Sequence, residues 1–410
     1  MAPSRSSSLL APIFFTFFVD NFCWAIVFPI FAPYFMDPGN QVFDYTVSES
    51  TRALFLGLFL MAFSLGQFIG APILGEYADR HGRRNALLIT ILFTIGGLAL
   101  SAWSMQVGHL VGLFIGRLLT GVFAGNMSIC LAAVTDLSHT ETAKVKNFGY
   151  LSVCAGLSFV MGAYVGGKLS DATVNQRFEP DVPLWIATGL TMLNFLYVLW
   201  KFNETAKIDE SKPFAFFECF KNIGKALLTK RIKRMYLVFF LFLIAWTVLL
   251  QFTPLLMVQR FGFTSSNIGD LALYMGLCWA FGSGYLNKLL LRYFKPLQTL
   301  EASLILITLF TGLIALPFGF YGSVGVIGFA VMVSSIAWPL CTGVISSRAP
   351  PAIQGKILGI SQSVQSLAMA IAPVIGGLAY KASLQTTFLV GAGASLLASV
   401  LYFTLKNRSS

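Results

Sequence analysis

Three ionisable residues stand inside long apolar stretches, where a charge is costly and therefore informative. Asp20 lies in VDNFCWAIVFPIFAP, Arg117 lies in LFIGRLLTGVFAG, and Glu301 lies near the start of a third such stretch. A carboxyl group in these surroundings can bind and release a proton, and a nearby arginine holds it ionised. We therefore expect proton coupling, with Asp20 as the acid, Arg117 as its partner and Glu301 as a further candidate.

No catalytic pattern accompanies these residues. The sequence contains no GxSxG, HExxH or Walker motif, and its three histidines, at 81, 109 and 139, all lie in expected loops. The six cysteines, at 23, 130, 154, 219, 278 and 341, lie almost entirely in apolar runs without CxxC or metal-like spacing. We expect no enzyme activity, no catalytic residue, no cofactor, no metal and no disulfide framework.

The composition indicates where these residues must sit. The 410 residues are 56% hydrophobic and 11% charged, with a mean hydropathy of +0.75, whereas soluble domains carry about 25% charged residues. The chain must therefore lie largely in a bilayer, and its length leaves room for about ten to fourteen transmembrane helices. The net charge of +11 is better explained by basic cytoplasmic loops than by nucleic acid binding.

Twelve apolar stretches are long enough to span a membrane. They cover residues 9–36, 52–77, 86–106, 109–133, 147–168 and 182–201, then 235–258, 267–290, 298–319, 321–346, 356–380 and 384–405. This predicts an all-α membrane protein of two pseudo-symmetric six-helix bundles, residues 1–201 and 235–410. The first stretch is too long for a signal peptide and is expected to stay as the first helix.

Residues 202–234 form the expected cytoplasmic linker. Apolar residues recur there at helical spacing, which predicts either an interfacial helix or an extension of the seventh span. With both termini and the linker inside, twenty-two of the 28 Lys and Arg residues lie in the cytoplasm, as the positive-inside preference requires.

The two halves also echo each other. KNFGYLSVCAGLSFVMGAYVGG, from Lys146, aligns without gaps with KILGISQSVQSLAMAIAPVIGG, from Lys356. Parallel repeats of this kind place a substrate site at the interface of the halves, near the membrane midplane. Six helices plus six, with such an echo, indicate a transporter.

The loop after the second span reads GEYADRHGRR and resembles the signature loop of the major facilitator superfamily, G-x-x-x-D-R-x-G-R-R. The matching residues are Gly75, Asp79, Arg80, Gly82, Arg83 and Arg84. Asp79 sits at a helix C-terminus, where the helix dipole disfavours an anion by about 0.3–1 kcal/mol, so it needs a partner. The resemblance implies that this partner is the N-terminus of the eleventh helix, and that the arginines reach an acid at the end of the fourth.

We expect Asp136 to fill that position, at the end of the fourth helix. The result would be a cytoplasmic latch that holds one access state and breaks during transport. A positive-inside anchor alone would explain the arginines but not Asp79. The segment Phe202–Thr205, FNET, resembles the usual end of the sixth helix in the same family.

Arg117, Gly121 and Gly125 match the fourth-helix motif of the same family, with Thr120 in place of the usual glutamine. By helical rise, Asp20 lies about 16 Å from the inner surface and Arg117 about 12 Å from the outer surface of a core about 30 Å thick. Their depths then agree to within a turn. Loss of water from the cavity favours the neutral acid, which couples protonation of Asp20 to the access state. The alternative is a static structural ion pair.

The first span also resembles that of the tetracycline and multidrug proton antiporters, in which an aspartate stands nine residues before a proline, as Asp20 and Pro29 do. GAYVGG, residues 162–167, resembles the antiporter motif G-P-x-x-G-G, with Ala163 in place of the proline, which weakens antiport against symport. Small residues at this spacing let helices approach closely and rock. With the echo APVIGG, the expected helix-packing residues are Gly162, Gly166, Gly167, Pro373, Gly376 and Gly377.

Other polar and aromatic side chains in the spans are candidates for the substrate cavity. They are Asn21, Trp24, Trp246, Gln251, Tyr274 and Trp338; the alternative for the aromatic ones is packing or contact with lipid. Glu301 lies about 6–8 Å from the cytoplasmic face by helical rise. Some tetracycline antiporters have an essential acid in this helix, but a snorkelling or structurally paired carboxylate is favoured here.

The resemblance implies a secondary transporter that moves a small, amphipathic molecule by alternating access, with proton antiport and efflux as the leading expectation. The alternative is a proton-coupled importer of a metabolite or a metal chelate such as a siderophore, in which Arg117 binds a substrate carboxylate. A receptor or structural assembly partner is disfavoured by the short loops. The expected partners are the substrate, protons and membrane lipids, with no nucleic acid, for a monomer in a bacterial-type inner membrane with both termini cytoplasmic.

Overall fold

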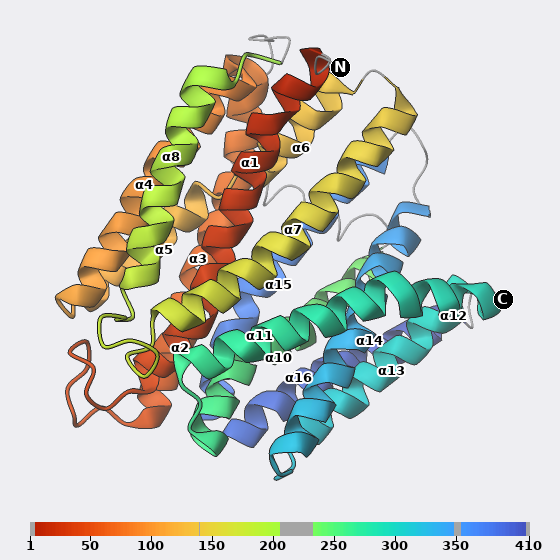
Figure 1. The fold of residues 1–410 in the computed structure, drawn as a ribbon. Coiled ribbons are helices and arrows are strands. Elements are labelled where there is room, and N and C mark those ends of the chain that lie inside the picture. The colour runs from red at the N-terminus through yellow and green to blue at the C-terminus, as the bar shows by residue number, and fades with distance from the viewer. Residues whose placement is uncertain (1–4, 139, 206–232, 348–353, 407–410) are drawn as a thin grey trace. The chain divides into compact units, whose positions relative to one another are not determined.

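The computed structural model describes residues 5–138, 140–205, 233–347 and 354–406. These residues form helices joined by short loops, with no strand among them (Figure 1). The all-α prediction is therefore confirmed. Most of the expected linker, with its proposed interfacial helix, lies outside the described residues.

The helices follow the predicted spans closely. The first half contains α1 (Arg5–Ile26), α2 (Phe28–Met36), α3 (Glu49–His81), α4 (Arg83–Gln106), α5 (Leu110–Val122), α6 (Asn126–Leu137), α7 (Glu141–Leu169) and α8 (Val182–Lys201). The second half contains α10 (Lys233–Phe261), α11 (Ser265–Ala280), η1 (Phe281–Leu286), α12 (Asn287–Tyr293), α13 (Pro296–Ile314), α14 (Phe320–Ser347), α15 (Gln354–Tyr380) and α16 (Leu384–Lys406).

Eleven spans in the described part of the chain are long and apolar enough to cross a membrane. The remaining expected span, residues 267–290 and the eighth along the chain, is divided among α11, the π-helical η1 and α12. Such π-helical turns widen a helix locally and often occur at functional sites. Here Gly282 makes room for α14, because a Cβ at Gly282 would lie 2.6 Å from the carbonyl oxygen of Met332.

Two further spans are broken, and the breaks have local causes. The first span is interrupted at Val27, and Pro29 follows in the first turn of α2, where its missing N–H costs nothing. The fourth span is interrupted between α5 and α6, where the N–H of Ala124 bonds back to the carbonyl of Gly121 at 3.1 Å. As a result, Asn126 is the first residue of α6.

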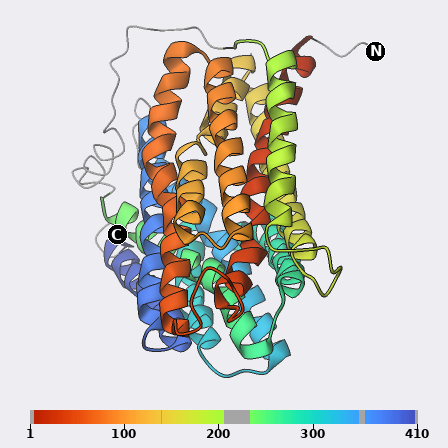
Figure 2. The same cartoon turned by 90° about the vertical axis from the view of Figure 1, so that its left-hand side faces the viewer.

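The chain divides into two compact units. The first comprises Met1–Tyr45, Ala62–Glu218 and Thr264–Ala272, and the second comprises Thr46–Met61, Cys219–Phe263 and Leu273–Ser410. In the first unit, α1 packs against α6, α7 and α8, and α4 packs against α5 and α8. Figure 2 shows the neighbouring α4 and α8 as the orange and yellow-green helices. In the second unit, α10 packs against α15 and α16, and α13 packs against α14 and α16.

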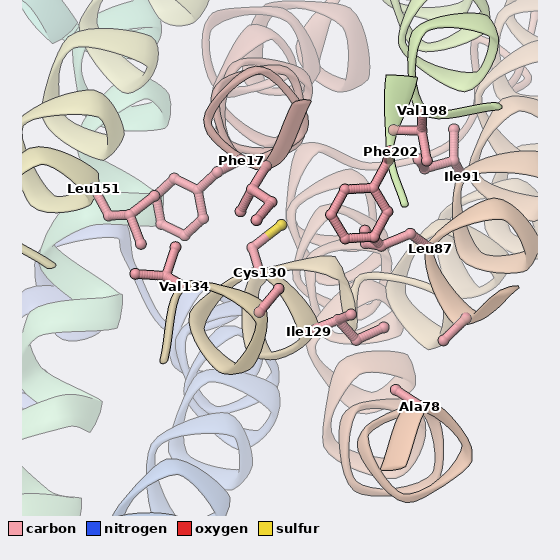
Figure 3. Packing of buried hydrophobic residues seen from close by; sticks show 13 residues of the cluster. Phe17, Ala78, Leu87, Ile91, Ile129, Cys130, Val134, Leu151, Val198 and Phe202 are labelled. Atoms are coloured by element: carbon pink, nitrogen blue, oxygen red, sulfur yellow. The ribbon is translucent and has the colours of Figure 1, made fainter. Parts of the chain in front are cut away.

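The core of the first unit is made of side chains from α1, α3, α4, α6, α7 and α8. Figure 3 shows Phe17 near Cys130 and Phe202 beside Leu87, all buried. Because lipid is as apolar as these side chains, close packing rather than removal of apolar surface from water holds such helices together. Three of these helices, α1, α4 and α6, also contain Asp20, Thr90 and Asn126, which are described below.

Candidate functional site

Asp20 accepts a hydrogen bond from the side-chain amide of Asn126. The distance from Asn126 Nδ2 to Asp20 Oδ1 is 3.1 Å. Thr90, on α4, donates from its hydroxyl to Asn126 Oδ1, the other end of the same amide. Asn126 is 3% exposed and Thr90 is fully buried. Three residues from α1, α4 and α6 therefore form one hydrogen-bonded chain that ends on the carboxylate.

The break in the fourth span is what places Asn126 there. Gly121 lies directly on the backbone of Phe63 in α3, where a Cβ would lie 2.8 Å from the carbonyl carbon of Phe63. Gly125 lies on Leu74, with a Cβ clearance of 2.9 Å to Leu74 Cδ1. The two glycines of the fourth-helix motif thus let α5 and α6 approach α3 on both sides of the break.

Arg117 is buried, at 7% exposure, between two aromatic rings. Its guanidinium carbon lies 4.4 Å from the ring centroid of Phe63 and 5.9 Å from that of Phe31. Cation–π contacts of this kind contribute about 2 kcal/mol when desolvated. Phe31 follows Asp20 by eleven residues in the first span, a rise of about 16 Å along a helix.

The contacts described above therefore place Asn126 next to Asp20, and two aromatic rings next to Arg117. Direct pairing of Asp20 with Arg117 during transport stays a prediction.

The signature loop holds two ion pairs around Arg83, of which the one with Asp136 was expected and the one with Asp79 was not. Its Nη2 lies 2.6 Å from Asp79 Oδ1, and its Nε lies 3.4 Å from Asp136 Oδ2. The structure thus brings the arginine, the loop aspartate and the acid at the end of the fourth span together. Arg80 lies in the last turn of α3, and a Cβ at Gly75 would meet open space.

Glu204 in the FNET segment caps the helix that follows this loop. Its carboxylate accepts hydrogen bonds from the backbone N–H groups of Arg83, at 2.7 Å, and Arg84, at 3.0 Å. The Arg84 guanidinium in turn donates to the carbonyl of Leu199, at 2.9 Å. The first backbone N–H groups of α4, which have no acceptor within the helix, therefore face an anion, and the helix dipole favours this arrangement.

The glycine motif of the fifth span lies against the first span. A Cβ at Gly162 would lie 2.5 Å from the carbonyl oxygen of Phe22, and a Cβ at Gly166 would collide with that of Ile26. Gly167 instead faces α11, where a Cβ at Gly167 would lie 2.8 Å from Gly269 Cα. These three glycines allow backbone-to-backbone approach on two sides of α7.

The echo of this motif in α15 is also closely packed. The carbonyl of Pro373 lies where a Cβ at Gly57 would stand, and a Cβ at Gly377 would lie 3.1 Å from the carbonyl of Ala53. Gly376 lies under the ring of Phe252.

The candidate cavity residues fall into separate groups. In the first unit, Asn21 donates to the carbonyl of Phe17 at 2.8 Å, and the ring centroid of Trp24 lies 5.5 Å from that of Phe159. In the second unit, the hydroxyl of Tyr274 donates to the carbonyl of Val324 at 3.3 Å. Gln251 Oε1 is buried without a hydrogen-bond partner in the described part of the chain.

Trp246 and Trp338 both contact Trp279, which lies in the last turn of α11. The ring centroids lie 4.7 Å and 6.2 Å from that of Trp279. Phe239 and Phe242 pack edge-on against Trp338, so five aromatic rings meet in the second unit. Glu301 is partly buried in α13.

The family model for the Major Facilitator Superfamily matches residues 13–336. The chain belongs to this superfamily. It is 26% identical to the class B tetracycline resistance protein of Escherichia coli over 350 residues, which cover 83% of this chain and 82% of that protein. It is 26% identical to the quinolone resistance protein NorA of Staphylococcus aureus over 410 residues, which cover 95% and 94% of the two chains.

Among solved structures, the human organic anion transporter MFSD10 (TETRAN) superposes with a TM-score of 0.70 at 21% identity. The match covers 97% of this chain and 100% of that one. This superfamily member is therefore a multi-pass integral membrane protein with the all-helical transporter fold, and a transporter of small molecules rather than an enzyme.

Four features of the site were not predicted from the sequence: Asn126, Thr90, the capping role of Glu204, and Trp279. An uncharged asparagine directly after a glycine, inside an apolar span, was the available signal for Asn126, because an unpaired amide is costly there. Thr90 gave no signal, since most threonines in such helices bond to their own backbone.

Proposed function

We propose that this protein exports a small amphipathic molecule in exchange for protons, with Asp20 as the proton-coupling acid. The observation that carries the proposal is the position of Asp20, a carboxylate within the first span whose hydrogen-bond partner is the neutral amide of Asn126. A neutral donor stabilises the carboxylate without cancelling its charge. Proton uptake at Asp20 therefore changes the charge inside the span.

That change can be coupled to access. An ionised carboxylate in a closed, water-free site costs several kcal/mol, on the order of the penalty for other buried ions. Closure with a proton on Asp20 avoids this cost. Closure with Asp20 ionised requires a compensating contact from the substrate. The protein therefore changes its access state in one direction with the proton bound and in the other direction with the substrate bound.

The substrate class is supported by the relatives and by the aromatic side chains. Two relatives are resistance proteins, one for tetracycline and one for quinolones. Both compounds are planar molecules that combine apolar rings with ionisable groups. The rings of Trp246, Trp279 and Trp338 provide surfaces suited to such molecules. We therefore favour a flat, amphipathic substrate over a sugar or a metal ion.

The second candidate is proton-coupled import of an organic anion. The buried guanidinium of Arg117 favours it, because a fixed positive charge in a span could bind a substrate carboxylate. The similarity in fold to an organic anion transporter is compatible with this role but extends to the fold alone.

We further propose that Arg83, Asp79 and Asp136 form a latch on the cytoplasmic side that opens once per cycle. Their separations of 2.6 and 3.4 Å support this role, and so does the place of Asp79 and Arg83 in the superfamily's signature loop. From the distribution of Lys and Arg residues we propose that both termini lie in the cytoplasm. From the compact loops we propose that the membrane is a bacterial-type inner membrane.

The purified protein in proteoliposomes tests the direction of coupling. Tetracycline, a fluoroquinolone and an aromatic organic anion are each added outside the proteoliposomes, and a pH gradient of either sign is imposed. Antiport requires uptake when the vesicle interior is the acidic side, and symport requires uptake when the exterior is acidic. Uptake driven by an acidic exterior for every transported compound would overturn the antiport proposal in favour of the importer.

A further inference from the structure

We propose that Asn126 is a positioning residue that sets the pH at which Asp20 takes up its proton, and that Thr90 fixes the orientation of the Asn126 amide. The inference rests on the proposed role of Asp20 and adds a specific control of that site. Nothing in the signature motifs of the superfamily includes either residue in this chain, because the fourth-helix motif ends at Gly125.

The geometry of Thr90 determines which end of the amide faces Asp20. Its hydroxyl carries one proton and lies within reach of three acceptors, the carbonyls of Ala86 and Leu87, each at 2.9 Å, and Asn126 Oδ1. When the hydroxyl donates to Asn126 Oδ1, the NH₂ group of Asn126 must face the other way. It then donates to Asp20 Oδ1, as the structure has it.

An NH₂ group in this position favours the ionised form of Asp20. A carboxylate accepts such a bond more strongly than a neutral carboxyl group does. Without the bond, or with the amide reversed so that its oxygen faces Asp20, the neutral form of Asp20 becomes more stable relative to the ionised form. Asp20 should then hold its proton up to a higher pH.

The groups around Asp20 allow this single hydrogen bond to change the protonation of Asp20. The helices packed against α1 are α2, α6, α7 and α8. The thiols of Cys23, on α1, and Cys130, on α6, are titratable groups that interact with Asp20. Charged residues of α6, α7 and α8 lie toward the helix ends, at Asp136, Glu141, Lys144, Lys146, Lys168 and Lys201, and α2 contains Tyr34 as its titratable residue, bonded to the carbonyl of Met105.

Infrared spectroscopy of the protein in proteoliposomes tests the inference without a transported substrate. The carbonyl band of the protonated Asp20 side chain is assigned by its loss in Asp20→Asn and is followed from pH 4 to pH 9. In Asn126→Ala we expect its midpoint to move up by about one to two pH units, the value of a hydrogen bond to a charged group.

Two threonine variants make the test independent of whether Asn126→Ala folds well. Thr90→Val keeps the volume and removes the hydroxyl that orients the amide, so we expect a smaller shift in the same direction. Thr94→Val is the matched control, because Thr94 is also a buried threonine on α4, and its hydroxyl donates to the backbone carbonyl of Thr90 at 2.8 Å. We expect its midpoint to match that of the wild type.

The possible failures are distinguishable. A wild-type midpoint in both Asn126→Ala and Thr90→Val, with the Asp20 band present, would overturn the role of Asn126 and leave the proposed function standing. Equal shifts in Thr90→Val and Thr94→Val would show a general effect of α4 packing and would also overturn it. Absence of any band that depends on Asp20 would contradict the proposed function itself.

Discussion

The carboxylate of Glu204 occupies the space beside Gly82 in which any other residue would place its side chain. Gly82 has φ of +90°, and a Cβ built there would lie 2.6 Å from Glu204 Cδ. The same carboxylate bonds the first N–H groups of α4. The backbone conformation of Gly82 thus favours glycine at this position of the signature loop, and the acid that caps the next helix fills the space beside it.

Replacing Glu204 should weaken this cap. In Glu204→Gln the charge is lost, and we expect a loss of about 1 kcal/mol of stability, the usual value of an N-cap. Thermal unfolding in detergent measures it. Glu179→Gln, at an exposed glutamate outside the caps described above, is the control that should leave the unfolding temperature unchanged.

The latch around Arg83 should loosen when Asp136 is neutralised. The side chain of Asp136 is 28% exposed, and its distance from Arg83 is 3.4 Å, so the contact is a modest one of at most about 1 kcal/mol. We expect Asp136→Asn to raise amide hydrogen exchange in residues 79–86 by about two- to fivefold. Exchange at the wild-type rate in this segment would show that Asp136 does not hold the loop.

Substitutions at two glycines on α7 distinguish the effect of close packing on stability from the effect of helix propensity. Gly166→Ala places a methyl group against the carbonyl of Ile26, whereas Gly156→Ala meets open space. We expect Gly166→Ala to lower stability by about 1–3 kcal/mol, and Gly156→Ala to raise it by up to about 1 kcal/mol. Thermal unfolding of the two variants in parallel provides the measurement, and similar behaviour of both would contradict the packing assigned to GAYVGG.

Asp171, in the loop after α7, should make stability depend on acid pH. Burial alone would raise the pKa of Asp171, but hydrogen bonds from Thr173, Thr264 and Ser266 outweigh it and hold this pKa below its ordinary value. The contribution is therefore complete above the unfolded value of about 3.9 and is lost as the pH falls through the lowered pKa.

Thermal unfolding of wild type and Asp171→Asn from pH 7 to pH 3 measures this dependence. We expect the wild type to be more stable at pH 7, and the difference to shrink below about pH 4. Thr173→Val removes the donor at 2.6 Å from Asp171 Oδ1 and should lose part of the same difference. A gap that stays constant down to pH 3 would contradict the assignment.

The spans and the signature loop were predictable because long apolar runs and basic loops leave a strong pattern in the sequence. The breaks at Val27 and before Asn126 were not, since a proline or glycine is tolerated in many unbroken membrane helices. The neighbours of Arg117 were also out of reach, because the contact with Phe63 depends on the register between two helices. Hydropathy fixes neither that register nor the rotation of each helix.

The roles of single residues were therefore less predictable than their positions. Asp20 stood out because a charge in a span is rare. Asn126 did not, because the role proposed for it depends on the hydrogen bonds that Thr90 and Asp20 make with its two ends.

The most direct test of the central claim compares Asp20→Asn with the wild type in proteoliposomes loaded with a transported compound, with and without a pH gradient. We expect Asp20→Asn to lose accumulation driven by the gradient while it still exchanges labelled for unlabelled substrate, because only the proton site is removed. Glu301→Gln, measured in parallel, shows whether the second acid contributes. Wild-type accumulation driven by the gradient in Asp20→Asn would contradict the role assigned to Asp20.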